Sequence, residues 1–440
     1  MGTLHYQKEI PVRFEPDVLV AGGGPAGCAA AWAAAKAGAK VLLLEGHSCL
    51  GGLGTAGMVP AFMSMGDGER FLCSGFANDI MQGLYGEDFD LKTGVYAKGS
   101  MSIRAEELKR LYDEALERAG VEFFFQTQLI DATVEDGRIQ EAVFTAKSGI
   151  FAVKAKMYID CTGDGDLSVM SGASFEKGDE AGNMMAGSLC SLWSGIDWSR
   201  VIKPDSRKIE RAIEDGVFAI PDRSLPGMWK ISDSVGGGNI GHLFGLDATD
   251  ERSLTKGLLR GRQYVKEYER YFKDYLTGYE KMELIATGSL PGIRESRRIR
   301  CIKTLDYSAF ETLAVYDDEI GRYCYSVDIH PSNNSLAEHL KTNGNFKARH
   351  LKKGESYGIP YGALVPKDLQ NVVVAGRCIG TDRLMHGSMR VMPGCYISGQ
   401  ASGAAAALCI KRGEAPEKLD VKALQRALLD LGACLPNAEV

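Results

Sequence analysis

A dinucleotide-binding fingerprint near the start of the chain constrains its fold more than any other feature. An apolar run, Val18–Ala21, leads into the glycine pattern GxGxxG at 22–27, and an alanine-rich stretch follows. A second apolar run, 40–44, then ends on Glu45, where the acid that binds a ribose is expected. This order predicts a strand, a glycine turn, a helix over 25–37 and a second strand, as in a Rossmann βαβ unit.

The glycines and the first helical residues have separate tasks in such a unit. Gly22 permits the tight turn, Gly24 lets a pyrophosphate approach the backbone, and Gly27 brings the helix close to the strand. Pro25 and Ala26 begin the helix, so the phosphates would lie on its unpaired N–H groups and its positive end.

Composition and charge narrow the class of protein. Of the residues, 45% are hydrophobic and 25% are charged, and 440 residues exceed what one hydrophobic core usually serves, so we expect a globular chain of two domains. A net charge of −6 argues against a nucleic-acid partner, and no apolar run approaches the roughly 18 residues of a membrane span. Eleven cysteines without a C-x-x-C pair argue against a metal site and predict reduced thiols, hence a cytoplasmic location.

The segment after Glu45 favours FAD over NAD. A glycine cluster with a small hydroxyl residue, 51–57, suits a flat ring that lies over bare backbone, whereas an NAD domain would continue directly into a helix. An amphipathic helix over 104–119 follows, and short alternating runs over 130–154 are typical of an antiparallel meander. A further strand, 157–161, ends on glycines.

The same pattern returns near the end of the chain. An apolar run at 371–374 closes on Gly376 and Arg377, and a helix of small residues follows Pro393. A dinucleotide domain assembled from distant segments is what a two-domain flavoenzyme needs. We therefore expect an α/β fold with a Rossmann-type FAD-binding domain (parallel sheet with β-meander) from 1–175 and 357–415, an inserted α+β substrate domain at 176–356, and a helical tail at 416–440.

Six blocks of the chain carry a resemblance to a known family. They lie at 22–27, 51–57, 160–166, 292–298, 359–366 and 375–403. In these blocks the chain resembles the FAD-dependent oxidoreductases of the glutathione-reductase-like flavoprotein superfamily, and most of all a bacterial branch whose substrates are mostly unassigned.

The resemblance implies which residues hold FAD. Gly22, Gly24, Pro25, Ala26 and Gly27 would lie at the pyrophosphate, Glu45 at the ribose, Gly51, Gly52 and Thr55 along the middle of the cofactor, Leu129 near the adenine, Thr162, Gly163 and Asp164 beside the pyrophosphate, Gly376 and Arg377 at the ribityl chain, and Met392 and Pro393 near the pyrimidine edge of the flavin.

The candidates for chemistry are His386, Arg390, Arg294 and His330, with Asp328 as the partner of His330. His386 is the leading general base because its ordinary pKa lies near neutral pH, although a purely structural hydrogen bond is an equal alternative. Arg390 would anchor a carboxylate or stabilise the flavin anion, and structural pairing is the alternative. Arg294 lies in a charge run that is ordinarily typical of a solvated surface, and the resemblance implies that Arg294 or Arg298 reaches the active site. An alternating run that begins near Tyr323 and closes at His330 predicts a strand in which Asp328 and His330 share one face and could hold a substrate hydroxyl; a buried structural histidine is the alternative.

A second glycine pattern, 236–241, also reads GxGxxG. The residues before it make a poor buried strand and those after it do not begin a convincing helix, so we expect a loop or a sheet edge and no second nucleotide site.

These features predict an FAD-dependent dehydrogenase or oxidase. It would transfer a hydride between flavin N5 and a small polar metabolite, such as a hydroxy acid, a sugar-like alcohol or an unsaturated acid. Two alternatives stay open: a flavin-dependent isomerase or hydratase without net redox chemistry, and a non-catalytic protein that binds FAD. The expected partner is a small-molecule substrate, with no nucleic acid and no membrane, and a homo-oligomer is compatible with the sequence.

Overall fold

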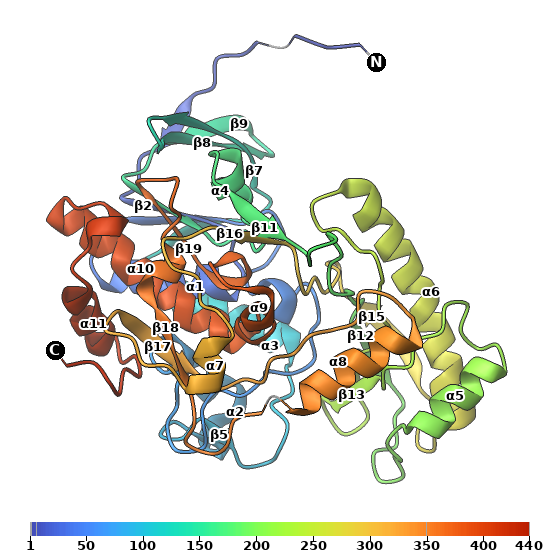
Figure 1. Cartoon of the computed structure of the whole chain (residues 1–440). Helices are drawn as coiled ribbons and strands as arrows, with labels where there is room; N and C mark the ends of the chain where they lie inside the picture. Colours follow the sequence, from blue (N-terminus) through green and yellow to red (C-terminus); the bar gives the residue numbers. More distant parts are fainter. Residues whose placement is uncertain (1, 6, 349, 440) are drawn as a thin grey trace.

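A five-stranded parallel sheet forms the framework of the larger of two lobes (Figure 1). The computed structural model describes residues 2–5, 7–348 and 350–439. The strand order is β19-β10-β2-β3-β6, with β2 at Val18–Ala21, β3 at Val41–Leu44, β6 at Glu122–Phe124, β10 at Met157–Asp160 and β19 at Val372–Val374. All residues of β2, β3, β10 and β19 are buried, as in a parallel sheet covered on both faces. The strands predicted near both ends of the chain therefore lie in one sheet.

Two helices pack against each other beside this sheet. They are α1 (Pro25–Lys36) and α10 (Met392–Arg412). A Cβ atom on Gly399 would lie 2.2 Å from the Ala26 carbonyl oxygen, and one on Gly403 would lie 2.1 Å from that of Ala30. Glycine at these two positions is what allows the helix axes to approach so closely.

The predicted meander is present as a separate sheet in the order β1-β9-β8-β7. Its antiparallel strands are β7 (Gln128–Glu135), β8 (Arg138–Ala146) and β9 (Gly149–Val153). A short strand that we did not predict, β1 (Val12–Phe14), pairs in parallel with β9. The amphipathic helix is α3 (Ala105–Ala119), which ends at Gly120 in a left-handed conformation.

The smaller lobe has a four-stranded antiparallel sheet and a long helix, at the right in Figure 1. The sheet order is β13-β14-β12-β15, with β12 at Ser191–Ser194, β13 at Gly227–Lys230, β14 at Gly236–Asn239 and β15 at Glu283–Thr287. The helices are α5 (Ser206–Glu214) and α6 (Glu251–Tyr275). Trp193, Tyr264, Tyr268 and Phe272 lie in its hydrophobic cluster, which is distinct from that of the larger lobe.

The expectation for the second glycine pattern was partly wrong. Gly236–Asn239 is neither a loop nor a sheet edge, because β14 pairs with β13 on one side and with β12 on the other. The three glycines are buried, and a Cβ on Gly237 would lie 2.5 Å from the Pro60 side chain, so the small residues let neighbouring groups pack onto the strand.

Part of the predicted inserted unit packs in the larger lobe. Buried residues between Ile299 and Val327 belong to the same hydrophobic cluster as the parallel sheet, because β17 (Glu319–Tyr323) pairs with β18 (Tyr357–Pro360) and lies beside α10. The tail helix α11 (Val421–Asp430) joins that cluster through Leu424 and Leu428.

The remaining elements are short connections, apart from α2 and α8. They are α2 (Phe76–Tyr85), β4 (Phe89–Asp90), β5 (Val95–Tyr96), α4 (Asp166–Met170), β11 (Phe175–Lys177), β16 (Arg297–Ile299), α7 (Ser308–Thr312), α8 (Leu336–Ala348) and α9 (Arg383–Met389).

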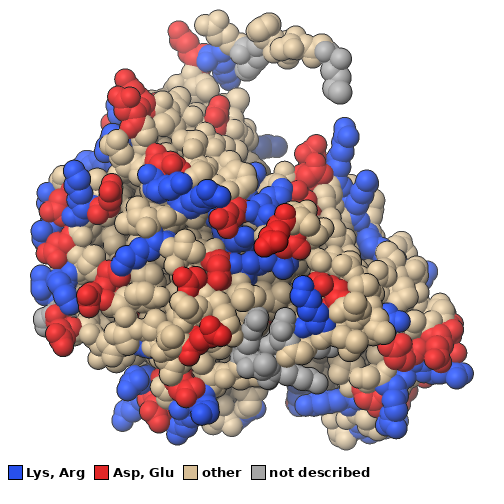
Figure 2. All heavy atoms as spheres, in the orientation of Figure 1, with Lys and Arg blue, Asp and Glu red and all other residues tan. Residues whose placement is uncertain are grey.

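The surface carries charges of both signs. On the face drawn in Figure 2, Lys and Arg are interspersed with Asp and Glu. None of the helices in the described part of the chain combines the length and the apolar character that a membrane crossing requires.

Candidate active site

A cavity of about 440 Å³ opens at the carboxyl ends of β2, β10 and β19. The register explains its position, because Asp160 at the end of β10 lies beside both Ala21 and Val374. Ligands of open α/β sheets bind at this edge. Most of the residues predicted to bind the cofactor line this cavity: Gly22, Gly24, Pro25, Ala26, Glu45, Gly52, Leu129, Thr162, Gly163, Asp164, Gly376, Arg377 and Met392.

Four other residues of the predicted set do not line the cavity. Gly27 lies inside α1, where a Cβ would be 1.9 Å from the Gly22 carbonyl oxygen. The Gly51 N–H donates to Gly23 O at 2.8 Å, and the Thr55 hydroxyl donates to Leu50 O at 2.5 Å. Pro393 is buried in the first turn of α10. These four residues support the residues that line the cavity. Their direct contact with the cofactor stays a prediction.

Glu45 organises the glycine turn. Its carboxylate accepts hydrogen bonds from the backbone N–H of Gly23 at 2.6 Å and of His47 at 2.8 Å, and the residue is almost fully buried. The acid that closes β3 therefore fixes the turn after β2 while it also lines the cavity.

The first turns of α1 and α10, which border the cavity, are suited to binding a dinucleotide. A Cβ on Gly24 would have no atom within 4 Å, so the backbone at this position is open to a ligand, in contrast to Gly22 and Gly27. Neither α1 nor α10 has a side-chain cap or an acidic residue in its first turn. Unpaired N–H groups and the positive helix ends are suited to a pyrophosphate at α1 and to an electron-rich ring edge at α10.

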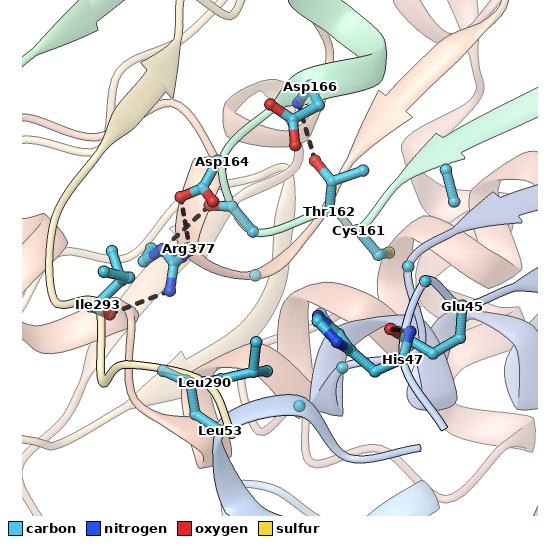
Figure 3. A pocket seen from close by; sticks show the side chains of 18 of the residues that line it. Glu45, His47, Leu53, Cys161, Thr162, Asp164, Asp166, Leu290, Ile293 and Arg377 are labelled. Atoms are coloured by element: carbon cyan, nitrogen blue, oxygen red, sulfur yellow. Dashed lines mark hydrogen bonds and ion pairs between the residues drawn. The ribbon is translucent and has the colours of Figure 1, made fainter. Parts of the chain in front are cut away.

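Arg377 joins three segments of the wall. Its guanidinium donates to Asp164 Oδ1 at 2.6 Å, to Gly163 O at 3.1 Å and to Ile293 O at 3.0 Å. Figure 3 shows this side chain between Asp164 and Ile293, across the cavity from Glu45 and His47. Arg377 therefore ties the end of β10 to the segment that enters from the smaller lobe.

A second cavity, of about 110 Å³, adjoins the first. The two cavities share lining residues, namely Leu53, Ile293, Arg390 and Met392. Polar side chains from both lobes line the second cavity: Ser188, Asn239, Arg294, Tyr325, Asp328, His330 and Arg390. Three of the four residues predicted to do chemistry thus meet at one place beside the dinucleotide cavity.

Arg294 is a buried cation without a carboxylate partner. Its guanidinium donates to Ala186 O at 2.8 Å and to Asn239 Oδ1 at 3.1 Å. Within the described chain no carboxylate oxygen lies within 4.0 Å of it. Burial and the nearby charge of Arg390 lower its pKa to about 10.

Arg390, Asp328 and His330 form a hydrogen-bonded group. Arg390 Nη2 donates to the Asp328 backbone oxygen at 3.0 Å and to Oδ2 at 3.1 Å, and its buried Nε has no partner among the described residues. Asp328 Oδ2 also lies 3.2 Å from His330 Nε2. Bonds to His330 and the charge of Arg390 hold the pKa of Asp328 far below its usual range, whereas burial and Arg294 lower the pKa of His330 to about 3. The prediction of a strand from about Tyr323 to His330 was wrong, because β17 ends at Tyr323. Asp328 and His330 nevertheless line one cavity.

His386 lies outside the lining of both cavities. It is buried in α9, and its Nε2 donates to Arg294 O at 3.0 Å. Burial and the charge of Arg298 lower its pKa well below the usual value. This geometry agrees with a structural hydrogen bond and not with a general base. The His386 side chain bonds to the backbone of Arg294 and does not line either cavity.

Sequence reasoning missed several polar residues of the site. Asn239 ends the glycine strand β14, and its Oδ1 accepts from both Ser188 and Arg294. Tyr325 lines the second cavity, and His242 with Asp222 lies behind His330. The pattern at 236–241 predicts a loop or a sheet edge without a ligand, so it gives no sign that the amide and the histidine near its end belong to the site.

Comparison with known proteins adds three findings. The family model described as "FAD dependent oxidoreductase" matches residues 17–428. The chain is similar to thiamine thiazole synthase of Pyrococcus abyssi, with 29% identity over 168 residues, which are 36% of this chain and 62% of that protein. It is also similar to digeranylgeranylglycerophospholipid reductase 1 of Methanopyrus kandleri, with 30% identity over 157 residues, 34% of this chain and 40% of the relative.

Among solved structures, a geranylgeranyl bacteriochlorophyll reductase-like protein from Thermoplasma acidophilum has a similar fold. The TM-score is 0.50 at 14% identity, over 95% of this chain and 82% of the other. The curated relatives thus match about a third of this chain and less than two thirds of their own length, and the likeness to the solved structure concerns the fold.

Proposed function

The chain belongs to the family of FAD-dependent oxidoreductases, and from this premise we propose that it transfers a hydride between FAD and a carbon atom of a small anionic metabolite in the second cavity. When bound, FAD supplies a two-electron acceptor and donor at N5. Among the substrate classes that the sequence leaves open, this proposal favours hydroxy acids and unsaturated acids over neutral sugar-like alcohols.

The unpaired charge of Arg294 is the observation that carries this proposal. A buried charge that lacks a counter-charge costs on the order of 3 kcal/mol. Arg294 and Arg390 bring two positive charges to the cavity, and the Asp328 carboxylate balances only one of them. A substrate carboxylate would supply the missing negative charge and would accept hydrogen bonds from a fixed guanidinium.

The surrounding side chains would hold such a substrate in one orientation. Asn239 and the Ala186 carbonyl fix the plane of Arg294, and Asp328 fixes Arg390. Met392 at the start of α10 lines both cavities, so the substrate would lie next to the part of the cofactor that reaches this helix. The Asp328–His330 pair would exchange the proton of a substrate hydroxyl.

The experiment that tests this proposal compares charged and neutral forms of the same compound. FAD-loaded protein is mixed anaerobically with a panel of 2-hydroxy acids and with their amides, and the loss of flavin absorbance is recorded. We expect bleaching by an acid and at least tenfold slower bleaching by its amide. Equal rates for an acid and its amide would contradict an anionic substrate.

Variants of two arginines that are close in sequence make the test more specific. Arg294→Gln should weaken binding of the active acid roughly 100-fold, because a buried charge–charge hydrogen bond is lost. Arg294→Lys should keep part of the affinity. Arg300→Gln is the control, because Arg300 is exposed and its partner Glu176 lies at the surface.

A further inference from the structure

Two histidines form a direct ring-to-ring hydrogen bond behind the second cavity. His242 Nε2 lies 2.8 Å from His330 Nδ1. At the outer ends, Asp222 lies 3.1 and 3.2 Å from His242 Nδ1, and Asp328 Oδ2 lies 3.2 Å from His330 Nε2. We call these four residues the histidine relay.

The relay crosses from one lobe to the other. His242 follows β14 of the smaller lobe, and His330 follows β17 of the larger one. Asp222 is held by the backbone N–H groups of Ser224 at 3.0 Å and of His242 at 2.9 Å. Asp222 and His242 are buried, whereas His330 lines the cavity, so only one end of the relay can meet a substrate.

The hydrogen-bond pattern fixes the number of protons. A carboxylate only accepts hydrogen bonds, so the contacts with Asp222 and Asp328 are both made when the ring nitrogens that face them carry a hydrogen. The contact between the rings needs one more hydrogen. This complete pattern has three hydrogens and one positive charge, so it is the form that the pair takes after it has accepted a proton; the neutral pair has two hydrogens and lacks the one on His330 Nε2. Both acids are ionised, since the charge and hydrogen bond of His242 lower the pKa of Asp222 to about 2, and His330 and Arg390 hold the pKa of Asp328 far below its usual range.

We propose that His330 is the catalytic base of the proposed oxidation and that His242 and Asp222 are positioning residues that take the resulting charge away from the cavity. This inference rests on the proposed function. It is carried by the 2.8 Å contact between the rings and by a carboxylate at each end.

The step balances as follows for a hydroxy acid. Before the reaction the pair has two hydrogens, on His242 Nδ1 and on His330 Nδ1, and His330 Nε2 is a free base. The substrate O–H bond breaks and its proton binds to His330 Nε2, while the hydrogen between the rings moves from His330 Nδ1 to His242 Nε2. The two electrons leave the carbon as the hydride that FAD accepts, and a C=O bond forms. The positive charge then lies on His242, beside Asp222.

The neighbouring charges explain why one histidine alone would be a weak base. Arg294 and burial disfavour a positive charge on His330, and Asp328 offsets them only in part. His242 faces Asp222, to which the Tyr268 hydroxyl also donates at 3.4 Å. A proton that arrives at His330 is therefore held more strongly when its charge appears on the other ring.

The first test measures the rate of flavin reduction against pH. In His242→Gln a polar side chain still faces His330, but it cannot accept the proton that His330 would pass on. We expect the limiting rate of anaerobic reduction by the active acid to fall about 100-fold, KM to stay within threefold, and the rise of the rate with pH near neutrality to disappear. His339→Gln is the control, since His339 lies near the same charges but is not one of the four groups.

The second test does not depend on turnover. In oxidised, FAD-loaded protein labelled with ¹⁵N in the histidine rings, NMR should show His242 and His330 gaining or losing their shared proton in a single step. In His242→Gln, the ring of His330 should stay neutral from pH 5 to 8. Asp222→Asn should give the same loss of joint titration and serves as the second variant if His242→Gln does not fold.

The outcomes separate the two proposals. If no acid bleaches the flavin while the rings titrate together, the proposed function fails and the shared proton stands. Independent titration of the two rings, or an unchanged pH profile in His242→Gln, would overturn the relay.

Discussion

Burial decides the protonation state of His386 in the folded protein. His386 Nε2 donates to Arg294 O, and the ring is surrounded by protein with Arg298 and Arg390 nearby. Its pKa therefore falls well below the usual value of 6.5, and the ring is neutral in the folded protein. The unfolded chain has no such restraint, so the two states bind different numbers of protons below neutral pH.

His386→Gln should make the stability less dependent on acid. A histidine with a lowered folded pKa stabilises the fold fully above pH 6.5, and this contribution is lost as pH falls, by about 1.4 kcal/mol per pH unit. Glutamine does not titrate and still offers an N–H donor. The free energy of unfolding in urea, measured at pH 6 and at pH 5, should therefore fall by about 1.4 kcal/mol less in the variant than in the wild type. His5→Gln, in the exposed N-terminal segment, is the control; equal slopes in the wild type and His386→Gln would contradict a neutral buried ring.

At the scale of elements, the turn from β2 to α1 uses two glycines for different purposes. A Cβ on Gly24 meets open space, and one on Gly27 would lie 1.9 Å from a backbone oxygen. Gly24→Ala should leave the unfolding free energy of the apoprotein within about 0.5 kcal/mol of the wild type and weaken FAD binding about tenfold.

Gly27→Ala should lower the unfolding free energy by about 3 kcal/mol, because the backbone must move to make room for the methyl group. Urea unfolding and a fluorescence titration with FAD measure both; an unaffected FAD affinity in Gly24→Ala would show that the cofactor does not approach there.

The contact between α1 and α10 depends on the same kind of close approach. Gly403→Ala places a methyl group 2.1 Å from the Ala30 carbonyl oxygen, so the helices must separate. We expect a loss of about 3 kcal/mol in the unfolding free energy. Lys411→Ala, on the exposed side of α10, should change it by less than about 0.5 kcal/mol. An unfolding free energy of Gly403→Ala equal to that of Lys411→Ala would mean that α1 and α10 can accommodate the added methyl group.

At the scale of the whole molecule, FAD should act as a bridge between distant parts of the chain. Ligand binding to the folded state alone adds about 2.7 kcal/mol of stability at 100 times Kd. Arg377→Gln removes the link between Asp164 and Ile293, so at a fixed FAD concentration the gain in thermal stability should be less than half that of the wild type. Arg412→Gln, which breaks only the surface ion pairs with Glu414 and Asp420, should keep the full gain. An equal gain in thermal stability on FAD addition in both variants would contradict a role for the Arg377 hydrogen bonds in holding the cofactor.

The sequence was sufficient for the parts of the fold that follow local rules. The fingerprint, the meander turns and the buried strand at 372–374 have strong periodic or glycine signals, and the elements predicted there are present. The strand predicted from about Tyr323 to His330 is not, because β17 ends at Tyr323. The family resemblance implied that Glu45 and Met392 belong to one site, and both residues line the first cavity. The glutathione-reductase-like kinship, the cytoplasmic location and a homo-oligomer remain predictions.

The relay and the role of β14 could not be derived in this way. His242 and His330 lie 88 residues apart and meet only because the two lobes pack together. Gly236–Asn239 has the composition of a loop, and only pairing on both sides makes it a strand. His386 has the right chemistry for a base, yet its position within α9 turns the ring away from both cavities.

The sheet order has a consequence for how the protein is made. β10 lies between β2 and β19, and β19 is translated long after the other strands of the sheet. Chains emerge from the ribosome at roughly 5–20 residues per second and begin to fold from the N-terminal side. One flank of β10 therefore stays unpaired until residues 372–374 have been made, and the first cavity, which Met392 lines, can be completed only after residue 392 has been released.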